Sequence, residues 1–239
     1  MAKLSGAEHF SVDGTMLKAF ASIKSFRAKD GSDKPPDAGR NGERDFKQEK
    51  LSNETHASTT DPDARLYRKA KGQESKLAYL GHALMENRNG LAVDGRVTTS
   101  TGTAEPEAAD DMTKDLAAGA TLGADKGYDV EAFVEGLEER GIVPHIAVNG
   151  SVTKTGKTRK TAVPPEVAAS PGYAVSIRIR KRIEEIFGWT KITGGLAQLK
   201  LRGLDKVGAV FVFGLAACNL VRLPKLLART AELCPDGVK

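Results

Sequence analysis

Apolar and polar residues alternate with two different periods along this chain of 239 residues. Five short runs predict strands, at residues 8–13, 76–86, 91–100, 121–125 and 142–148. The first run is expected to end at Asp13, because Gly14 and Thr15 suggest a turn. The Asn89-Gly90 pair between the second and third runs is a hairpin signal. Residues 16–26 fit either a short helix or an extended segment.

Other stretches repeat their apolar residues with the helical period. They predict helices at residues 105–118, 130–140, 173–188 and 201–227. Asp129 is a candidate N-cap for the second helix, and Gly141 ends it. The last helix is strongly apolar, and Pro224 is expected to kink or end it.

Two polar stretches interrupt this pattern. Residues 27–75 hold few large apolar side chains, so they predict a solvated insertion that is partly disordered. The insertion ends in a basic run at residues 65–71. Residues 149–172 form a second basic loop, in which Pro164 and Pro165 argue against a helix. Both basic segments fit contact with phosphates as well as plain solvated surface.

The order of elements predicts an α/β fold. Three strands come first, with at least one hairpin, and alternating strands and helices then extend the sheet by crossover connections. A mixed central sheet with helices on both faces satisfies this order. We expect a single domain at residues 1–230 and a tail at residues 231–239.

Composition bears on the kind of partner, on the state of the cysteines and on whether the chain spans a membrane. The 36 basic and 31 acidic residues leave a formal net charge of +5, which favours a polyanionic partner without requiring one. Cys218 and Cys234 lack metal-ligand spacing and are expected to be reduced thiols in a cytosolic protein. The most apolar run, residues 207–221, is too short for a membrane span, so a core helix is expected.

One helix carries the candidate chemistry. Arg180, Glu184 and Lys191 follow the spacing R-x3-E-x6-K, which places them within roughly 40° of one another on a helix. Glu184 is expected near the core face between two cations, and Glu185 is expected in solvent. The alternative is a plain amphipathic basic helix.

Two further carboxylates are predicted at strand ends, at Asp13 and Asp125. Together with Glu184 they are hard oxygen ligands that suit Mg²⁺ or Mn²⁺. Two such ions can activate a water or a 3′-hydroxyl and stabilise the leaving oxygen of a phosphodiester. Arg180 and Lys191 would then hold phosphates beside the metals.

In these residues the chain resembles the DDE transposases of bacterial insertion sequences, in the IS-four and IS-five groups. The matching segments keep their order over nearly the whole chain: FSVDGT (10–15), LSNETHASTTDPDARLYRK (51–69), LMENRNGL (84–91), LGADKGYD (122–129), PHIAVN (144–149) and RKRIEEIFGWTK (180–191). The resemblance implies a ribonuclease-H-like fold and cut-and-paste DNA transposition. It also implies an acidic triad of Asp13, Asp125 and Glu184 that holds two Mg²⁺ or Mn²⁺ ions.

The resemblance further implies double-stranded DNA, as transposon ends and target, for a partner, together with a possible homodimer and a location in the bacterial cytoplasm at the nucleoid. The candidate DNA contacts are Arg180, Lys191, Lys126, Arg182 and Trp189. Two features depart from the family pattern. Ile177 stands where the signature has Tyr, and Asp13 follows only twelve residues, so we expect an N-terminally truncated chain that binds DNA ends poorly.

Several alternatives stay open. His82 and His145 are expected to be structural, and Trp189 fits either a stacked base or a core aromatic. An inactive remnant that only binds DNA is one alternative function. An aspartyl-nucleophile phosphatase is less favoured, because Ser11 stands where the V-D-G-T resemblance requires the nucleophilic Asp.

Overall fold

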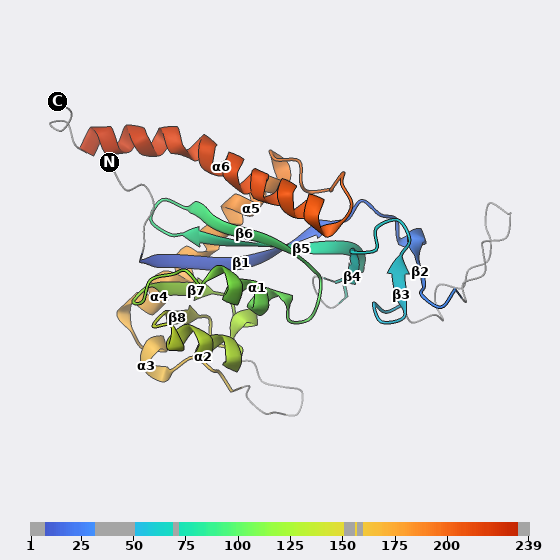
Figure 1. The fold of residues 1–239 in the computed structure, drawn as a ribbon. Coiled ribbons are helices and arrows are strands. Elements are labelled where there is room, and N and C mark those ends of the chain that lie inside the picture. The colour runs from blue at the N-terminus through green and yellow to red at the C-terminus, as the bar shows by residue number, and fades with distance from the viewer. Residues whose placement is uncertain (1–7, 32–50, 69–71, 151–155, 157–159, 234–239) are drawn as a thin grey trace.

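The computed structural model describes residues 8–31, 51–68, 72–150, 156 and 160–233. Its centre is a mixed sheet in the order β4-β5-β1-β7-β8, with β6 also paired to β5 (Figure 1). The strands are β1 (His9–Lys18), β4 (Arg65–Tyr67), β5 (Lys76–Glu86), β6 (Leu91–Thr99), β7 (Thr121–Ala124) and β8 (Val143–Ile146). β5 is antiparallel to β1, β4 and β6, whereas β7 is parallel to β1 and β8.

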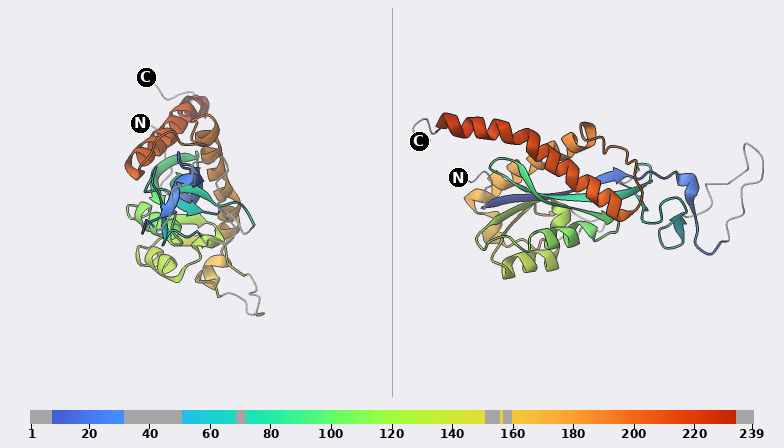
Figure 2. Two further views of the ribbon diagram at one scale, coloured as in Figure 1. Left: turned by 90° about the vertical axis from the view of Figure 1, so that its right-hand side faces the viewer. Right: turned by 45° about the horizontal axis from the view of Figure 1, so that its top comes forward.

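Helices cover both faces of this sheet (Figures 1 and 2). One face packs on α1 (Ala104–Met112) and α2 (Glu131–Glu139), around Val12, Leu122 and Leu137. The other packs on α5 (Ile183–Ile192) and α6 (Leu204–Leu233), around Tyr79 and Phe211. The predicted fold class, an α/β fold with a mixed central sheet and helices on both faces, is therefore confirmed.

The first strand is longer than predicted. β1 continues to Lys18, so Asp13 lies in the middle of the strand and not at its end. Gly14 and Thr15, expected in a turn, pair with His82 and Gly81 of β5. The long antiparallel ladder overrides the local turn preference of Gly14. Past β1 the chain forms a short 3₁₀ helix, η1 (Ile23–Ser25).

The expected insertion is partly ordered. β2 (Phe26–Ala28) and β3 (His56–Ser58) form a separate two-stranded sheet, and β4 joins the edge of the main sheet. Asp61 is buried and accepts a 2.6 Å hydrogen bond from the Tyr79 hydroxyl. A polar stretch can therefore hold structure through buried polar contacts that hydrophobic patterning does not reveal. The remainder of the insertion, residues 32–50 and 69–71, lies outside the described residues.

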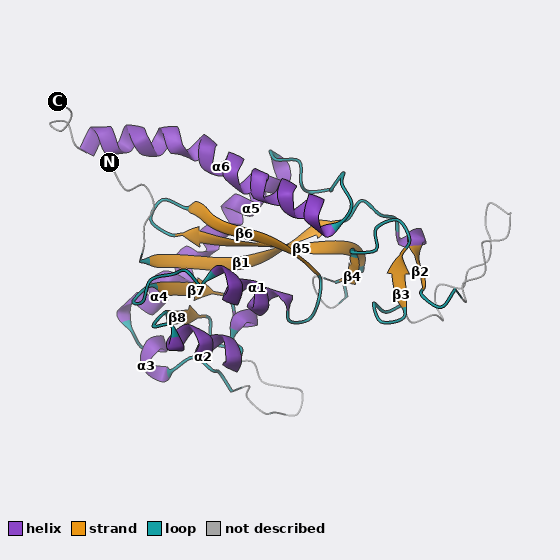
Figure 3. Cartoon of the chain, viewed as in Figure 1, coloured by secondary structure: helices purple, strands orange, loops and turns teal. Residues whose placement is uncertain are grey.

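The helices also differ from expectation at their ends (Figure 3). α1 ends at Met112, before the predicted end at residue 118, and the Thr113 hydroxyl donates to the Ala109 carbonyl in its last turn. Pro165 begins the short helix α3 (Pro165–Ala168), where a proline at the first position costs no hydrogen bond. The prediction that Pro164 and Pro165 exclude a helix was wrong.

The helix predicted at residues 173–188, which carries Arg180 and Glu184, consists of three consecutive segments in the structure. They are α4 (Pro171–Ile179), the 3₁₀ turn η3 (Arg180–Arg182) and α5. α6 runs to Leu233, with Pro224 inside it and not at its end. By length and composition alone, its residues Leu204–Arg229 are also long and apolar enough to cross a membrane.

Candidate active site

Asp13 lies on β1, and Asp125 directly follows the neighbouring parallel strand β7, at the same level. Ser11 of β1 pairs with Gly123 of β7, and each Asp follows two residues later. β7 ends at Ala124 as predicted, whereas β1 continues. Beyond the end of β7, one edge of β1 therefore loses its neighbouring strand. The two carboxylates lie at this open edge.

Backbone amides orient both carboxylates. The Gly14 N–H donates to Asp13 Oδ1 at 2.8 Å, and the Gly127 N–H donates to Asp125 Oδ1 at 2.6 Å. The second bond caps the 3₁₀ turn η2 (Lys126–Tyr128). Both side chains are therefore held in place by local backbone geometry, which fixes a site before any ligand binds.

The site is electrostatically unfavourable for Asp13. Burial raises its pKa to about 6, and repulsion by Asp125 and Glu184 adds to this effect. The Gly14 amide and the Arg180 guanidinium act in the opposite direction. A half-buried carboxylate near two others is the environment in which a cation is stabilising.

The segment from η3 to α5 brings the other predicted residues to this edge. A Cβ placed on Gly123 would lie 3.3 Å from Arg180 Cβ, so Arg180 packs directly over β7. Its Nε is buried without a hydrogen-bond partner among the described residues. Lys191 Nζ donates to Thr15 Oγ1 at 2.6 Å, two residues beyond Asp13.

The helical pattern predicted Glu184 near the core face, and this prediction was wrong, because Glu184 is exposed. Ile183 and Ile186 occupy that face, and Glu184 lies beside it, where its charge still acts on Asp13. Glu185 is also exposed, and it forms a 2.9 Å ion pair with Arg222 of α6. The two adjacent glutamates therefore face different surroundings.

A fourth carboxylate, Glu105, was missed by sequence reasoning. It lies in the first turn of α1. A Cβ placed on Gly14 would lie 2.7 Å from Glu105 Oε1, and one placed on Gly127 would lie 3.9 Å from Oε2. Burial, then Asp125 and Asp13, raise the pKa of Glu105. Glu105 thus reaches the same site between the glycines that follow the two Asp residues.

A signal for Glu105 exists in the sequence. Its place in the first turn of a helix was assigned to the helix dipole alone, which is the commoner role of such a residue. Gly14 and Gly127 each lie within two residues of a predicted ligand, and their lack of a side chain leaves room for another group.

Tyr128 lies under this acidic cluster. Its side chain is buried, and its hydroxyl has no hydrogen-bond partner among the residues that the structure describes. Burial, followed by the charges of Glu105, Asp13 and Asp125, raises its pKa well above the ordinary value. Tyr128 therefore stays neutral and can donate a hydrogen bond toward the site.

The other candidate DNA contacts have varied surroundings. Lys126 is exposed on η2, next to Asp125. Arg182 donates to the Asn87 carbonyl at 3.1 Å and so supports the β5–β6 hairpin. Trp189 is partly buried against the core around Phe211. Lys126 is thus presented to solvent beside the site, whereas Arg182 and Trp189 also have structural contacts.

The carboxylates fit a hard divalent cation in donor type and charge. Each Asp uses one oxygen for a backbone hydrogen bond. In the described part of the chain, however, no three acidic, histidine or cysteine side chains converge closely enough to hold one ion. The donor set fits the metal chemistry, and its members are spaced more widely than in a loaded site.

Ser11 stands where an aspartyl-nucleophile phosphatase would need its nucleophilic Asp, and it is not accessible. Its side chain is fully buried and donates a 2.8 Å hydrogen bond to Asn87 Oδ1. His82 is also fully buried, with Nε2 2.8 Å from the Thr98 hydroxyl, and burial lowers its pKa to about 4. Both side chains therefore make structural hydrogen bonds inside the fold.

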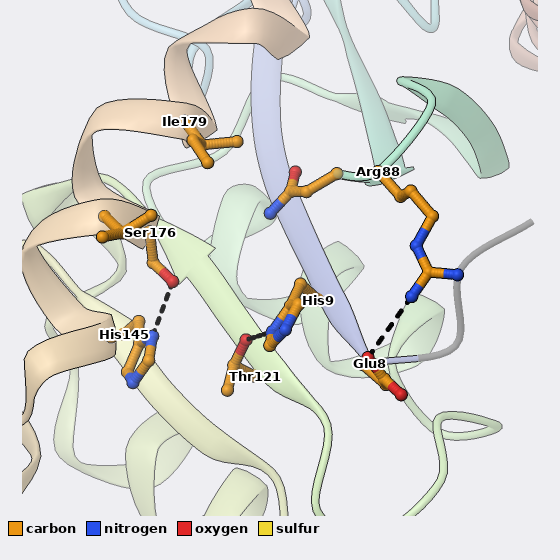
Figure 4. A pocket seen from close by; sticks show the side chains of 10 residues that line it. Glu8, His9, Arg88, Thr121, His145, Ser176 and Ile179 are labelled. Carbon is orange, nitrogen blue, oxygen red and sulfur yellow. Dashed lines mark hydrogen bonds and ion pairs between the residues drawn. The ribbon is translucent and has the colours of Figure 1, made fainter.

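A cavity of about 470 Å³ lies at the start of β1, beside His9 (Figure 4). His9, Thr121 and residues of α4 line it. In it, His145 Nδ1 lies 2.7 Å from Ser176 Oγ, and burial lowers the His145 pKa. None of the predicted site carboxylates lines this cavity, so it is distinct from the acidic cluster.

Two solved structures show partial likeness to this chain. One is a simian T-cell lymphotropic virus intasome in complex with the PP2A regulatory subunit B56 gamma, at 9% identity and a TM-score of 0.36, over 90% of this chain and 49% of that one. The other is a piggyBac transposase synaptic complex with hairpin DNA, at 10% identity and a TM-score of 0.47, over 98% of this chain and 50% of that one. The chain spans about half the length of each.

The comparison with curated proteins finds no match. The comparison with protein families does: residues 5–220 match the family described as the transposase DDE domain. This match covers most of the 239 residues and includes Asp13, Asp125 and Glu184. The chain therefore belongs to the transposase DDE domain family.

Proposed function

We propose that this chain catalyses metal-dependent DNA strand cleavage and strand transfer during transposition of a bacterial insertion sequence. The observation that carries the proposal is the placement of Asp13 on β1 level with Asp125 just after the adjacent parallel strand β7, with Asp13 within electrostatic reach of Glu184. Membership in the transposase family supports it. The proposed catalytic residues are Asp13, Asp125 and Glu184.

These three carboxylates would hold two Mg²⁺ or Mn²⁺ ions, and Glu105 lies close enough to support the same site. When bound, such ions activate a water or 3′-hydroxyl and stabilise the leaving oxygen in an in-line displacement. The amide bonds from Gly14 and Gly127 orient the two Asp side chains for this role. Tyr128 supplies a neutral donor beneath the cluster.

The substrate is proposed to be double-stranded DNA in the bacterial cytoplasm, at the nucleoid. Arg180 and Lys191 flank the acidic edge and would bind the phosphates on either side of the scissile bond. Lys126, Arg182 and Trp189 are proposed as further contacts. Because Glu184 and Lys191 both lie on α5, this helix would place the bound metal and the DNA phosphate at a fixed position relative to each other.

The test uses the purified chain with supercoiled plasmid DNA in Mn²⁺ or Mg²⁺. Nicking should require the metal and disappear in Asp13→Asn, Asp125→Asn and Glu184→Gln. Glu185→Gln is the matched control, because Glu185 is the adjacent glutamate and pairs with Arg222 instead. The variants should keep the circular dichroism spectrum of the wild type.

Metal binding provides a second readout. Mn²⁺ should raise the unfolding temperature of the wild type, since a ligand that binds only the folded state stabilises it. The effect should be lost in Asp13→Asn. If wild type and Asp13→Asn respond equally to Mn²⁺, or if Glu184→Gln nicks DNA normally, the assigned residues are wrong.

A further inference from the structure

The cavity at the start of β1 has the dimensions of a small-molecule site (Figure 4). Its volume of about 470 Å³ falls within the range of pockets that hold small ligands. One wall comes from three adjacent strands and contributes His9, Thr121 and His145. A second wall is α4, so we call this feature the α4 cavity. None of its lining residues has a part in the proposed catalysis.

The α4 wall offers an apolar surface to the cavity. Gly172, Val175, Ser176 and Ile179 share one side of the helix, because they recur at steps of three and four residues. The Ser176 hydroxyl lies 2.7 Å from His145 Nδ1, so its hydrogen bonding is satisfied inside the fold. Val175 is 43% exposed, and Gly172 has no side chain to fill the space. This wall therefore fits the apolar body of a ligand.

Asn87 brings an unused hydrogen-bond donor to the cavity. The residue is 8% exposed, and its Oδ1 accepts a 2.8 Å hydrogen bond from Ser11 Oγ. Within the described part of the chain, Asn87 Nδ2 donates to no acceptor. A buried N–H group without an acceptor is unfavourable for stability. An acceptor atom of a bound ligand would satisfy it.

Arg88 supplies a positive charge at the edge of the cavity (Figure 4). Its guanidinium lies 3.6 Å from the Glu8 carboxylate, and the two side chains are 63% and 69% exposed. An exposed ion pair of this kind contributes little free energy, so an anion can displace Glu8. The planar guanidinium suits an anionic group with several oxygens. Charge complementarity thus favours a ligand with a negative charge.

We propose that the α4 cavity binds a small aromatic anion. The ring system would lie against Val175 and Ile179, and the anionic group would accept hydrogen bonds from Asn87 and Arg88. A rigid ring system loses little conformational freedom on binding, which favours it over a flexible apolar chain. The cavity thus combines an apolar wall with a few polar groups that fix orientation, as small-molecule sites do.

This site is separate from the acidic cluster. His9 precedes Asp13 by four residues on β1, which corresponds to about 13 Å along an extended strand. A small anion bound in the cavity would not touch the proposed metal ligands. The proposal therefore stands on the cavity alone and does not rest on the proposed function.

The experiment uses the histidines of the chain as reporters. The probe is 1-anilinonaphthalene-8-sulfonate (ANS), a fluorescent aromatic anion, titrated into the full chain while the imidazole signals are followed by NMR. Of the four histidines, His9 and His145 line the cavity, whereas His56 stacks on Phe26 and His82 is fully buried. The signals of His9 and His145 should shift on binding, and those of His56 and His82 should stay in place.

Two variants test the two halves of the site, with affinity measured by ANS fluorescence. Arg88→Ala should weaken binding at least about tenfold, because a charge-assisted hydrogen bond is lost. Arg178→Ala is its control, since Arg178 is an exposed arginine of α4 that does not line the cavity. Gly172→Leu should abolish binding, because a Cβ on Gly172 would lie 3.4 Å from His145 Cε1 and the added side chain would fill the cavity. Gly188→Leu is the matched control, with nothing within 4 Å of its Cβ.

Thermal unfolding checks that the variants fold. The proposal is overturned if ANS binds without moving the His9 and His145 signals, since the probe then occupies another surface, such as the exposed Phe213 of α6. Equal affinities of wild type and Arg88→Ala would also overturn it. Asp13→Asn should bind ANS as the wild type does, although it should not nick DNA. Loss of ANS binding in Asp13→Asn would place the probe at the acidic cluster and contradict the proposal.

Discussion

Lys191 Nζ donates a 2.6 Å hydrogen bond to Thr15 Oγ1, and this contact ties the last turn of α5 to β1. Thr15 lies two residues beyond Asp13 and on the same side of the strand. A cation is thereby fixed beside the acidic edge instead of extending into solvent. Such a placement serves a phosphate that enters from the open side of β1.

Lys191→Ala should weaken DNA binding, and its affinity for DNA should depend less on salt concentration than that of the wild type. If Lys191 contacts one phosphate, the slope of log Kd against log salt should fall by about 0.9. The measurement is a salt titration of duplex binding by fluorescence anisotropy. Lys114→Ala is the control, because Lys114 pairs with Asp111 on α1. A slope that is unchanged in Lys191→Ala would remove this residue from the DNA contacts.

Glu184→Gln and Glu185→Gln should have opposite profiles. The charge of Glu184 acts on Asp13, so Glu184→Gln should lose DNA nicking while its unfolding temperature stays constant or rises. Glu185→Gln should nick DNA at the wild-type rate. Its free energy of unfolding should fall by at most about 1 kcal/mol, because the exposed ion pair with Arg222 contributes little. Plasmid nicking and chemical denaturation measure both quantities. Equal nicking by the two variants would show that Glu184 has no special role.

Gly14→Ala should damage the site and spare the fold. The new methyl group would lie 2.7 Å from Glu105 Oε1, so the flexible carboxylate must move away. We expect nicking to fall at least about tenfold, which is the scale of a misplaced catalytic group, and Glu105→Gln to cause a similar loss. Plasmid nicking measures this.

Gly188→Ala is the matched control for Gly14→Ala. Nothing lies within 4 Å of a Cβ at Gly188, in the middle of α5, so alanine should stabilise the helix by about 0.4–1 kcal/mol. If Glu105→Gln nicks DNA at the wild-type rate, Glu105 is a bystander in the acidic cluster.

The sequence predicts most strands of the sheet well, but it predicts the end of β1 and the full set of site residues less well. Strand alternation gave β5, β6 and β7 near their observed bounds, because each is set by its own apolar pattern. The end of β1 was wrong because its length depends on β5, a partner 60 to 70 residues away that local patterning does not report. Glu105 was missed for the same reason, since its position near Gly14 depends on how α1 packs on the sheet.

Helical spacing placed Arg180, Glu184 and Lys191 on one side, and all three do reach the region of β1 and β7. How deeply each of these side chains is buried was not predictable from the spacing. The 3₁₀ turn at η3 changes the helical phase between Arg180 and Glu184, so a uniform 100° step misjudges the exposure of Glu184. A pattern reports which residues share a side, whereas burial depends on what packs against that side.

His82 should make the fold sensitive to acid. In the unfolded chain a histidine takes up a proton near pH 6.5, but burial lowers the His82 pKa to about 4 in the folded chain. Between these values the unfolded state binds more protons, so stability falls as the pH falls from about 6.5 to about 4. The full loss is about 3 kcal/mol, at 1.36 kcal/mol per pKa unit.

The measurement is the free energy of unfolding in urea at several pH values for wild type and His82→Gln. The variant starts less stable, and the gap should close by up to about 3 kcal/mol as the pH falls to 4. Asp13, whose raised pKa acts in the opposite sense, is present in both chains and cancels in the difference. Parallel profiles for wild type and His82→Gln would mean that His82 is protonated as readily in the folded chain as in the unfolded one.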